Sequence, residues 1–275
     1  MILTKKTGKI QVGGTGTQGN GVQRAEPPLV MDATNGSAIR DSNSAGQRSA
    51  VKSGSALRSL PPDCQRILIV GAGGFGREML QWARDAWPDQ ADRLAGFLSN
   101  DPGKLEGFGC TLPILASPDA FAPTTGDYMV LAIGIPGVRR MVAEDLLARG
   151  GRFLTLIHPT AVIADSAVIE AGAVICPYVI VSDAARVGRF TLLNYHASMA
   201  HDSVSGDFAV LSPYATLGGG AHAQEESFLG LHATLGPGTS LGARAKIAAQ
   251  SVLLHDAPAE SLAFGVPAKI MTGMR

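Results

Sequence analysis

The chain has 275 residues, a length that predicts two domains or one domain with added segments. Its 23 Lys and Arg are balanced by 23 Asp and Glu, so it has no net positive charge to attract nucleic acid. No apolar run is long enough for a membrane-spanning helix, and the three cysteines have neither disulfide-framework nor zinc-ribbon spacing. We therefore expect a cytoplasmic protein without membrane insertion or nucleic-acid binding.

Residues 1–63 differ in composition from the rest of the chain. The first 62 contain no Phe, Tyr or Trp, and they carry eight Lys and Arg against three Asp and Glu. Such a segment cannot bury enough apolar surface to offset the entropy lost on ordering. We predict a basic, disordered leader that ends near Pro61–Pro62.

Alternating strands and helices are predicted for residues 64–157. An apolar, β-branched run is followed at once by a glycine-rich loop and then by a helical pattern whose apolar residues share one face. The predicted elements are strands at 66–70, 94–98 and 128–133, a helix after the loop 71–76, and a helix at 138–149 that ends at Gly150–Gly151. This order indicates a small Rossmann-like α/β domain that binds its ligand at the carboxyl ends of parallel strands.

Sixteen consecutive hexapeptides occupy residues 158–253. The sixth position is Val, Ile, Leu or Met in fourteen of them, and the fourth is Ala, Ser or Thr in all but one. A register kept over this length predicts a parallel β-helix for residues 158–275, with a C-terminal tail. Each hexapeptide would form one short strand and one corner, and eighteen residues would advance the axis by about 4.8 Å.

A His-Asp pair occupies a predicted corner, where His201 cannot face the apolar interior. The surrounding segment, LNYHASMAHDSVSGDF at 193–208, resembles the "LN…HD/E…VIGDF" signature of the bacterial nucleotide-sugar acetyltransferases. The glycine loop, the "LIHPTAVI" entry to the repeats and the closing "FGVPAK" are also similar, so the resemblance covers about residues 65–272. The resemblance is to the bacillosamine-pathway N-acetyltransferases and sialic acid O-acetyltransferases, members of the hexapeptide-repeat acyltransferases. It implies a left-handed β-helix.

The resemblance implies acetyl transfer from acetyl-CoA to an amino or hydroxyl group of a nucleotide-linked sugar, without a metal. His201 would be the general base, since an imidazole with a near-neutral pKa can accept a proton at working pH. Asp202 would orient the ring, and Asn194 would hold the acceptor or the base. The resemblance further implies a homotrimer with active sites between subunits.

The resemblance also implies two sets of binding residues. Those expected to contact acetyl-CoA are Gly219, which would also supply the oxyanion N–H, together with Gly230, Leu231, Ala249, Lys246 and Lys269. Those expected to bind the nucleotide sugar are Gly71, Gly73, Gly74, Phe75, Gly76, Ser99, Asn100, Gly134 and Ile135. The glycines would bring backbone N–H groups to phosphates at a helix N-terminus. At 99–100 and 134–135 this chain departs from its relatives, which carry two acidic residues and Gly-Asn, so the nucleotide base stays open.

Three other interpretations remain. His196 and His201 are five residues apart, and His232 lies two coils beyond His196, a pattern similar to the zinc histidines of γ-class carbonic anhydrases. A β-helix without activity could serve as a sugar-nucleotide scaffold, because Val210 stands where some relatives have a histidine. The glycine loop could also bind a nicotinamide cofactor, although only Asp101 lies near the expected acidic position.

Overall fold

The computed structural model describes residues 51–52 and 59–273, all within one compact unit that covers Gln47–Arg275. The predicted disorder of the leader falls mostly outside the described residues. Two described leader residues form β1 (Val51–Lys52), which pairs antiparallel with β8 (Val168–Ile169).

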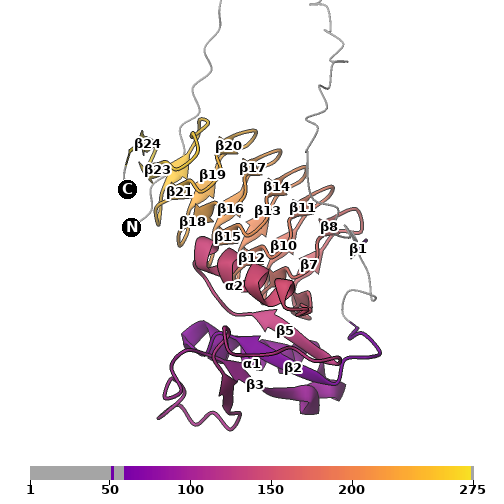
Figure 1. The fold of residues 1–275 in the computed structure, drawn as a ribbon. Helices are drawn as coiled ribbons and strands as arrows, with labels where there is room; N and C mark the ends of the chain where they lie inside the picture. The colour runs from indigo at the N-terminus through magenta and orange to yellow at the C-terminus, as the bar shows by residue number, and fades with distance from the viewer. Residues whose placement is uncertain (1–50, 53–58, 274–275) are drawn as a thin grey trace, which may run out of the picture. The chain divides into compact units, whose positions relative to one another are not determined.

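A parallel sheet of four strands, in the order β4-β3-β2-β5, forms the core of the α/β domain within the described residues (Figure 1). Its elements are β2 (Arg66–Val70), α1 (Gly74–Ala86), η2 (Pro88–Arg93), β3 (Leu94–Leu98), β4 (Ile114–Ala116), β5 (Asp127–Leu131) and α2 (Pro136–Ala148). The three predicted strands and two helices are confirmed. The short strand β4 and the 3-10 helix η2 have no clear period in the sequence and were not predicted.

The apolar face of α1 is the one that the periodicity predicts, because Met79, Leu80 and Ala83 are buried. Strand β5 ends two residues earlier than expected. The carbonyls of Leu131 and Ile133 accept hydrogen bonds from the Arg139 guanidinium, so they are not available for a longer strand ladder.

The hexapeptides form a parallel β-helix whose strands are two residues long and pair with strands eighteen residues away, as Ile180 does with Ser198. One face contains β6 (Leu156–Ile157), β9 (Val174–Ile175), β12 (Leu192–Leu193), β15 (Val210–Leu211), β18 (Phe228–Leu229), β21 (Lys246–Ile247) and β23 (Leu262–Gly265), with β24 (Ala268–Met271) antiparallel to β23. The next face contains β7 (Val162–Ile163), β10 (Ile180–Val181), β13 (Ser198–Met199), β16 (Thr216–Leu217), β19 (Thr234–Leu235) and β22 (Val252–Leu253). The last contains β8, β11 (Arg186–Val187), β14 (Val204–Ser205), β17 (His222–Ala223) and β20 (Ser240–Leu241).

The corners between these faces form three edges of a prism. We call the corners at 158–161, 176–179, 194–197, 212–215, 230–233 and 248–251 the first edge. The second edge consists of the corners at 164–167, 182–185, 200–203, 218–221 and 236–239. The third edge consists of the corners at 170–173, 188–191, 206–209, 224–227 and 242–245. The fourth and sixth residues of the repeat face the interior, while many third residues have positive φ, including Asp202 at 60°.

The third edge of the β-helix contacts the α/β domain. Phe190 and Phe208 stack with ring centroids 5.1 Å apart, and Phe153 of the α/β domain packs edge-on against Phe190 at the same distance. Arg140 on α2 forms ion pairs with Glu225 and Glu226. The first edge contacts the α/β domain through His158, whose Nε2 is 3.3 Å from the Asp85 carboxylate on α1. The second edge has no hydrogen bond or ion pair with the α/β domain among those of the described residues.

Candidate active site

His201 lies on the second edge, at a turn, and both it and Asp202 are exposed. The Asp202 carboxylate is 2.8 Å from Nδ1 of the imidazole, and 69% of the His201 side chain is accessible. A hydrogen bond from Nδ1–H to the carboxylate selects the tautomer with an unprotonated Nε2. The pair therefore presents a lone pair on Nε2 to a group outside the chain.

Gly219 lies one coil beyond His201 and directly against its ring. A Cβ added at Gly219 would be 2.7 Å from both Cε1 and Nε2 of the imidazole, so a side chain at 219 would occupy the space in front of Nε2. The N–H groups of Gly218 and Gly220 donate to Leu235 and His201 carbonyls, whereas the Gly219 N–H takes no part in this ladder between coils. The predicted oxyanion donor is therefore beside the predicted base, with its N–H available.

Asn194 is on the first edge, and strand β13 separates it from His201 on the second edge. Its side-chain oxygen accepts a hydrogen bond from the Tyr195 N–H at 2.8 Å. The predicted acetyl-CoA residues are divided in the same way. Gly230, Leu231 and Ala249 lie on the first edge, Gly219 on the second, Lys246 on β21 and Lys269 on β24. Within one chain, the predicted acetyl-CoA residues therefore do not all lie on one edge or face of the β-helix.

Four rings on the first edge stack along the axis of the β-helix. Tyr178, His196, Tyr214 and His232 follow one another at centroid distances of 5.0, 4.7 and 4.6 Å, with interplanar angles of 14° or less. We call them the first-edge ring column. The predicted alignment of His196 with His232 is correct, but the Tyr214 ring lies between the two imidazoles. No group of three or more metal-ligating side chains occurs among the described residues.

The carboxyl ends of β2, β3 and β5 bring the predicted nucleotide-sugar residues to one edge of the sheet. Val70 pairs with Leu98 and Leu131, so the residues that follow these strands are neighbours. Gly71 has a φ of 111°, and a Cβ there would be 2.6 Å from the Ala132 carbonyl oxygen. A glycine is needed for both reasons.

Helix α1 begins at the glycine loop without a side-chain cap on its Gly73 N-cap, which leaves its first N–H groups free to bind an anion. Asn100, Gly134 and Ile135 are exposed beside this loop, and Ser99 hydrogen-bonds within its own turn to Asp101. The Phe75 ring packs edge-on against Trp82 at 5.8 Å.

A cavity of about 340 Å³ adjoins the predicted nucleotide-sugar residues. It is lined by Asn100, Pro118, Asp119, Met141, Val142 and Asp145. A hydrogen bond from Ser117 holds the pKa of Asp119 below its ordinary value, so this wall of the cavity is anionic at neutral pH. The cavity presents carboxylate and amide groups next to the carboxyl end of β3.

Sequence reasoning missed Arg77, which follows the glycine loop directly. One guanidinium nitrogen is 3.9 Å from where a Gly74 Cβ would lie, and the Arg77 guanidinium carbon stands 3.5 Å above the centroid of the Phe108 ring. Arg77 has no ion pair among the described residues. A cation directly after a glycine-rich loop is a signal that the sequence already contained.

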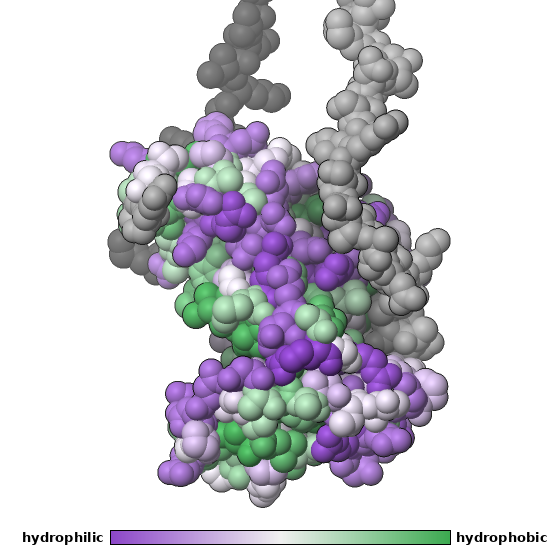
Figure 2. Space-filling view, viewed as in Figure 1, coloured by the Kyte–Doolittle hydropathy of each residue, from purple (hydrophilic) through white to green (hydrophobic). Residues whose placement is uncertain are grey.

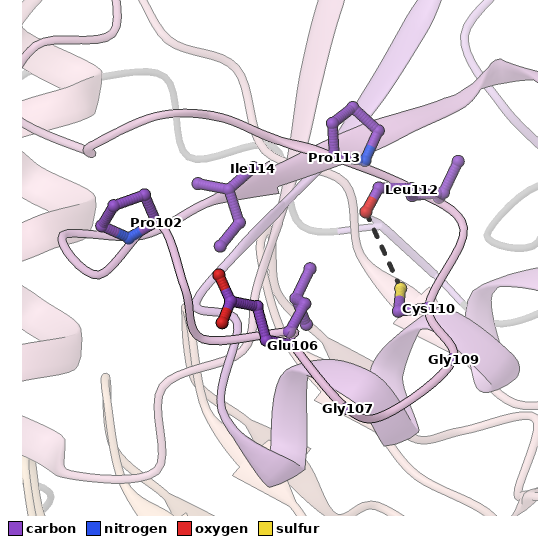
Figure 3. A pocket seen from close by; sticks show the side chains of 9 residues that line it. Pro102, Glu106, Gly107, Gly109, Cys110, Leu112, Pro113 and Ile114 are labelled. Carbon is purple, nitrogen blue, oxygen red and sulfur yellow. Dashed lines mark hydrogen bonds between the residues drawn. The ribbon is translucent and has the colours of Figure 1, made fainter.

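The loop that carries Phe108 also lines a second cavity, of about 350 Å³ (Figure 3). Glu106 projects into it, and the Cys110 thiol donates to the Leu112 carbonyl at 3.8 Å. None of the predicted site residues lines this cavity. Figure 2 shows hydrophilic and hydrophobic residues interspersed over the visible surface.

Cys176 is fully buried, and burial raises the pKa of its thiol well above the usual value, so the thiol is protonated at neutral pH. No described helix has the length and hydropathy needed to cross a bilayer.

Residues 66–146 match the family model described as PglD N-terminal domain. The chain is 33% identical over 146 residues to GDP-perosamine N-acetyltransferase of Escherichia coli O157:H7, a match that covers 49% of this chain and 61% of the relative. It is 34% identical over 116 residues to UDP-N-acetylbacillosamine N-acetyltransferase of Bacillus subtilis (strain 168), covering 40% and 51% of the two chains. The chain thus spans between half and two thirds of these curated relatives.

Solved structures match over a larger part of the chain. PerB from Caulobacter crescentus, in complex with CoA and GDP-perosamine, has a TM-score of 0.65 and 26% identity, covering 75% of this chain and 97% of that one. The acetyltransferase domain of PglB from Neisseria gonorrhoeae has a TM-score of 0.66 and 25% identity, covering 75% and 100%. These matches confirm the predicted fold class, a small α/β domain followed by a left-handed β-helix.

Proposed function

We propose that the chain is a member of the hexapeptide-repeat nucleotide-sugar acetyltransferases and that it transfers the acetyl group of acetyl-CoA to an amino group of a nucleotide-linked sugar. The observation that carries the proposal is the second-edge corner: an exposed His201 oriented by Asp202, with the open backbone of Gly219 against its ring. The relatives named as N-acetyltransferases support an amine as the acceptor.

In this mechanism His201 Nε2 takes a proton from the sugar amine as the amine nitrogen attacks the thioester carbonyl. Asp202 stabilises the imidazolium that forms, through the hydrogen bond to Nδ1. The Gly219 N–H is placed to donate to the carbonyl oxygen as negative charge develops on it. The imidazolium then returns its proton when the CoA thiolate leaves.

The active site is completed by a second copy of the chain. Asn194, Gly230, Leu231 and Ala249 lie on the first edge and His201 on the second, so one β-helix cannot present all of them to one substrate. If the first edge of one copy faces the second edge of the next, the contact is head-to-tail and can close a ring. With three copies, the number that the family resemblance implies, such a ring has three equivalent sites. We therefore propose a homotrimer in which Lys246 and Lys269 meet the phosphates of CoA.

The α/β domain would hold the nucleotide. A diphosphate can accept hydrogen bonds from the uncapped N-terminus of α1, beside the Arg77 guanidinium. The base would enter the cavity next to Asn100, and the sugar would extend past Gly134 and Ile135. The substrate class is a nucleoside diphosphate linked to an amino sugar.

Release of the CoA thiol should be measured with GDP-, UDP-, dTDP- and CMP-linked sugars, each with and without an amino group. His201→Ala should lower kcat by about a hundredfold or more, because it removes the base. His222→Ala is the matched control, an exposed histidine on β17 whose loss should leave kcat unchanged. Equal turnover by His201→Ala and the unmodified protein would contradict the assignment, and absence of CoA release with every sugar would favour an inactive scaffold.

A further inference from the structure

Arg139 lies in the first turns of α2, and its side chain is fully buried. Its Nε donates to the Phe190 carbonyl at 2.6 Å, and its Nη1 donates to the carbonyls of Leu131 and Ile133 at 2.8 and 2.9 Å. Its Nη2 is buried and has no hydrogen-bond partner within the part of the chain that the structure describes. One side chain therefore connects the end of β5 with the third edge of the β-helix.

The carbonyls held by Arg139 belong to the loop expected to contact the nucleotide sugar. Leu131 is the last residue of β5, and Ile133 directly precedes Gly134 and Ile135. The same loop forms a wall of the glycine cradle, because a Cβ at Gly71 would be 3.6 Å from the Ile133 side chain. The guanidinium thus determines where one side of the predicted diphosphate site lies.

The other end of this connection is rigid. Phe190 adopts a φ of 54°, and its buried ring packs against both Phe153 and Phe208. Its carbonyl is therefore a fixed acceptor on the β-helix. Because a planar guanidinium presents its N–H groups in a fixed fork, Arg139 also fixes the position of the 132–135 loop relative to the third edge.

The charge of Arg139 is not matched by a carboxylate. None of the ion pairs in the described residues involves Arg139, and burial lowers its pKa to about 9, so it remains a cation at neutral pH. The buried Cys176 thiol interacts with it electrostatically, but burial raises the pKa of Cys176 and keeps it neutral. A buried charge without a counter-charge is costly, and a diphosphate bound at the adjacent loops would supply the missing negative charge.

We propose that Arg139 is a positioning residue for the nucleotide diphosphate: it holds the 132–135 loop in its binding conformation and in register with the third edge, without touching the substrate. This inference rests on the proposed function, which it extends to a residue outside the predicted site. It also implies that binding of a nucleotide at the α/β domain stabilises the backbone of the β-helix around Phe190.

The inference is tested with Arg139→Lys and Arg139→Gln. A lysine ammonium cannot donate to all three carbonyls that the planar guanidinium reaches. Arg139→Lys should therefore lose the positioning role as Arg139→Gln does, although it retains the positive charge. Both variants should raise the KM for the nucleotide sugar, and the Kd for GDP or UDP, by about tenfold or more. The KM for acetyl-CoA should stay within about twofold of the value for the unmodified protein.

Arg140→Gln is the matched control. Its ion pairs with Glu225 and Glu226 cross the same junction but do not hold the 132–135 loop, so it should leave the KM for the sugar unchanged. If Arg139→Lys has the KM and Kd of the unmodified protein, or if both Arg139 variants lose thermal stability without a change in either constant, the positioning role is wrong. If the unmodified protein releases no CoA with any nucleotide sugar, the proposed function fails, while the GDP and UDP titrations still decide the role of Arg139.

Hydrogen exchange of the unmodified protein provides a measurement that does not depend on folding of the variants. Binding of GDP or UDP should slow amide exchange both at 132–135 and at 188–192, the segment around Phe190. Slower exchange at 132–135 alone would show that the third edge is not coupled to the nucleotide site. No change at either segment would also overturn the proposal.

Discussion

The first and third edges of the β-helix carry aromatic columns built in the same way but used differently. In both, rings at the third repeat position have positive φ, as in Phe208 at 58° and Tyr214 at 62°, and stack about one coil apart. On the third edge Phe190 and Phe208 are 3% and 2% exposed beneath the α/β domain. On the first edge Tyr178 and Tyr214 are 57% and 44% exposed.

The difference in exposure indicates what each stacked column contributes to stability or to assembly. The spacing of coils, about 4.8 Å, suits stacked rings, so the backbone alone permits a column on any edge. Phenylalanine has no polar atom and is suited to complete burial, whereas tyrosine and histidine keep a polar tip and are suited to an interface. We infer that the third-edge column stabilises the monomer, while the first-edge ring column forms part of the contact with another copy of the chain.

Phe208→Ala is the strongest test of this difference. Removing a fully buried ring should lower the free energy of unfolding by about 3–5 kcal/mol, because it leaves a cavity under the α/β domain. Urea unfolding of Phe208→Ala and of Tyr214→Ala, the matching position on the first edge, measures the contrast. Equal losses in the two variants would mean that covering by the α/β domain does not distinguish the columns.

Acid should weaken the domain that covers the third edge. Burial raises the pKa of Asp127, but hydrogen bonds from Arg66 and Thr124 outweigh this and hold the pKa below its ordinary value. The carboxylate therefore stabilises the fold above its ordinary pKa, and this stabilisation is lost as the pH falls through the lowered pKa. Unfolding midpoints measured from neutral to strongly acidic pH should decline less steeply in Asp127→Asn, and an identical decline would rule out this residue as the cause.

Tyr214→Ala should have the smallest effect on the free energy of unfolding of a single chain, about 1 kcal/mol or less, because the ring is half exposed. Its expected effect is on assembly: analytical ultracentrifugation should show dissociation at a higher protein concentration than for the unmodified protein. His222→Ala, on the face between the second and third edges, is the control. An unchanged assembly in Tyr214→Ala would remove the first-edge ring column from the proposed subunit contact.

The β-helix was largely predictable from the sequence because its contacts are periodic. A residue such as Ala197 or Met199 occupies a position that its place in the hexapeptide already defines, and both are buried. The turn at His201 followed from the same register. The α/β domain was predicted in its strands and helices but not in β4, which is three residues long and has no periodic signal.

The candidate site was predictable only in part. The residues Gly71 and Gly76 were predicted from the glycine-rich loop between a strand and a helix, as residues that bring backbone N–H groups to phosphates. The structure places both where a Cβ would collide with backbone. Arg139 could not be found in this way. An arginine on a helix is usually exposed, and nothing in its local sequence shows that three carbonyls from two domains surround it.

By itself the sequence determined the repeat, the direction in which each side chain of the β-helix points, and the corner that presents His201. These depend on contacts between residues at fixed separations along the chain. Only the tertiary structure decided that Arg139 joins β5 to Phe190, that Phe153 packs edge-on against Phe190, and that Arg140 forms ion pairs with Glu225 and Glu226. The physical reason is that these relations depend on how one domain packs on another, which short-range patterns do not encode.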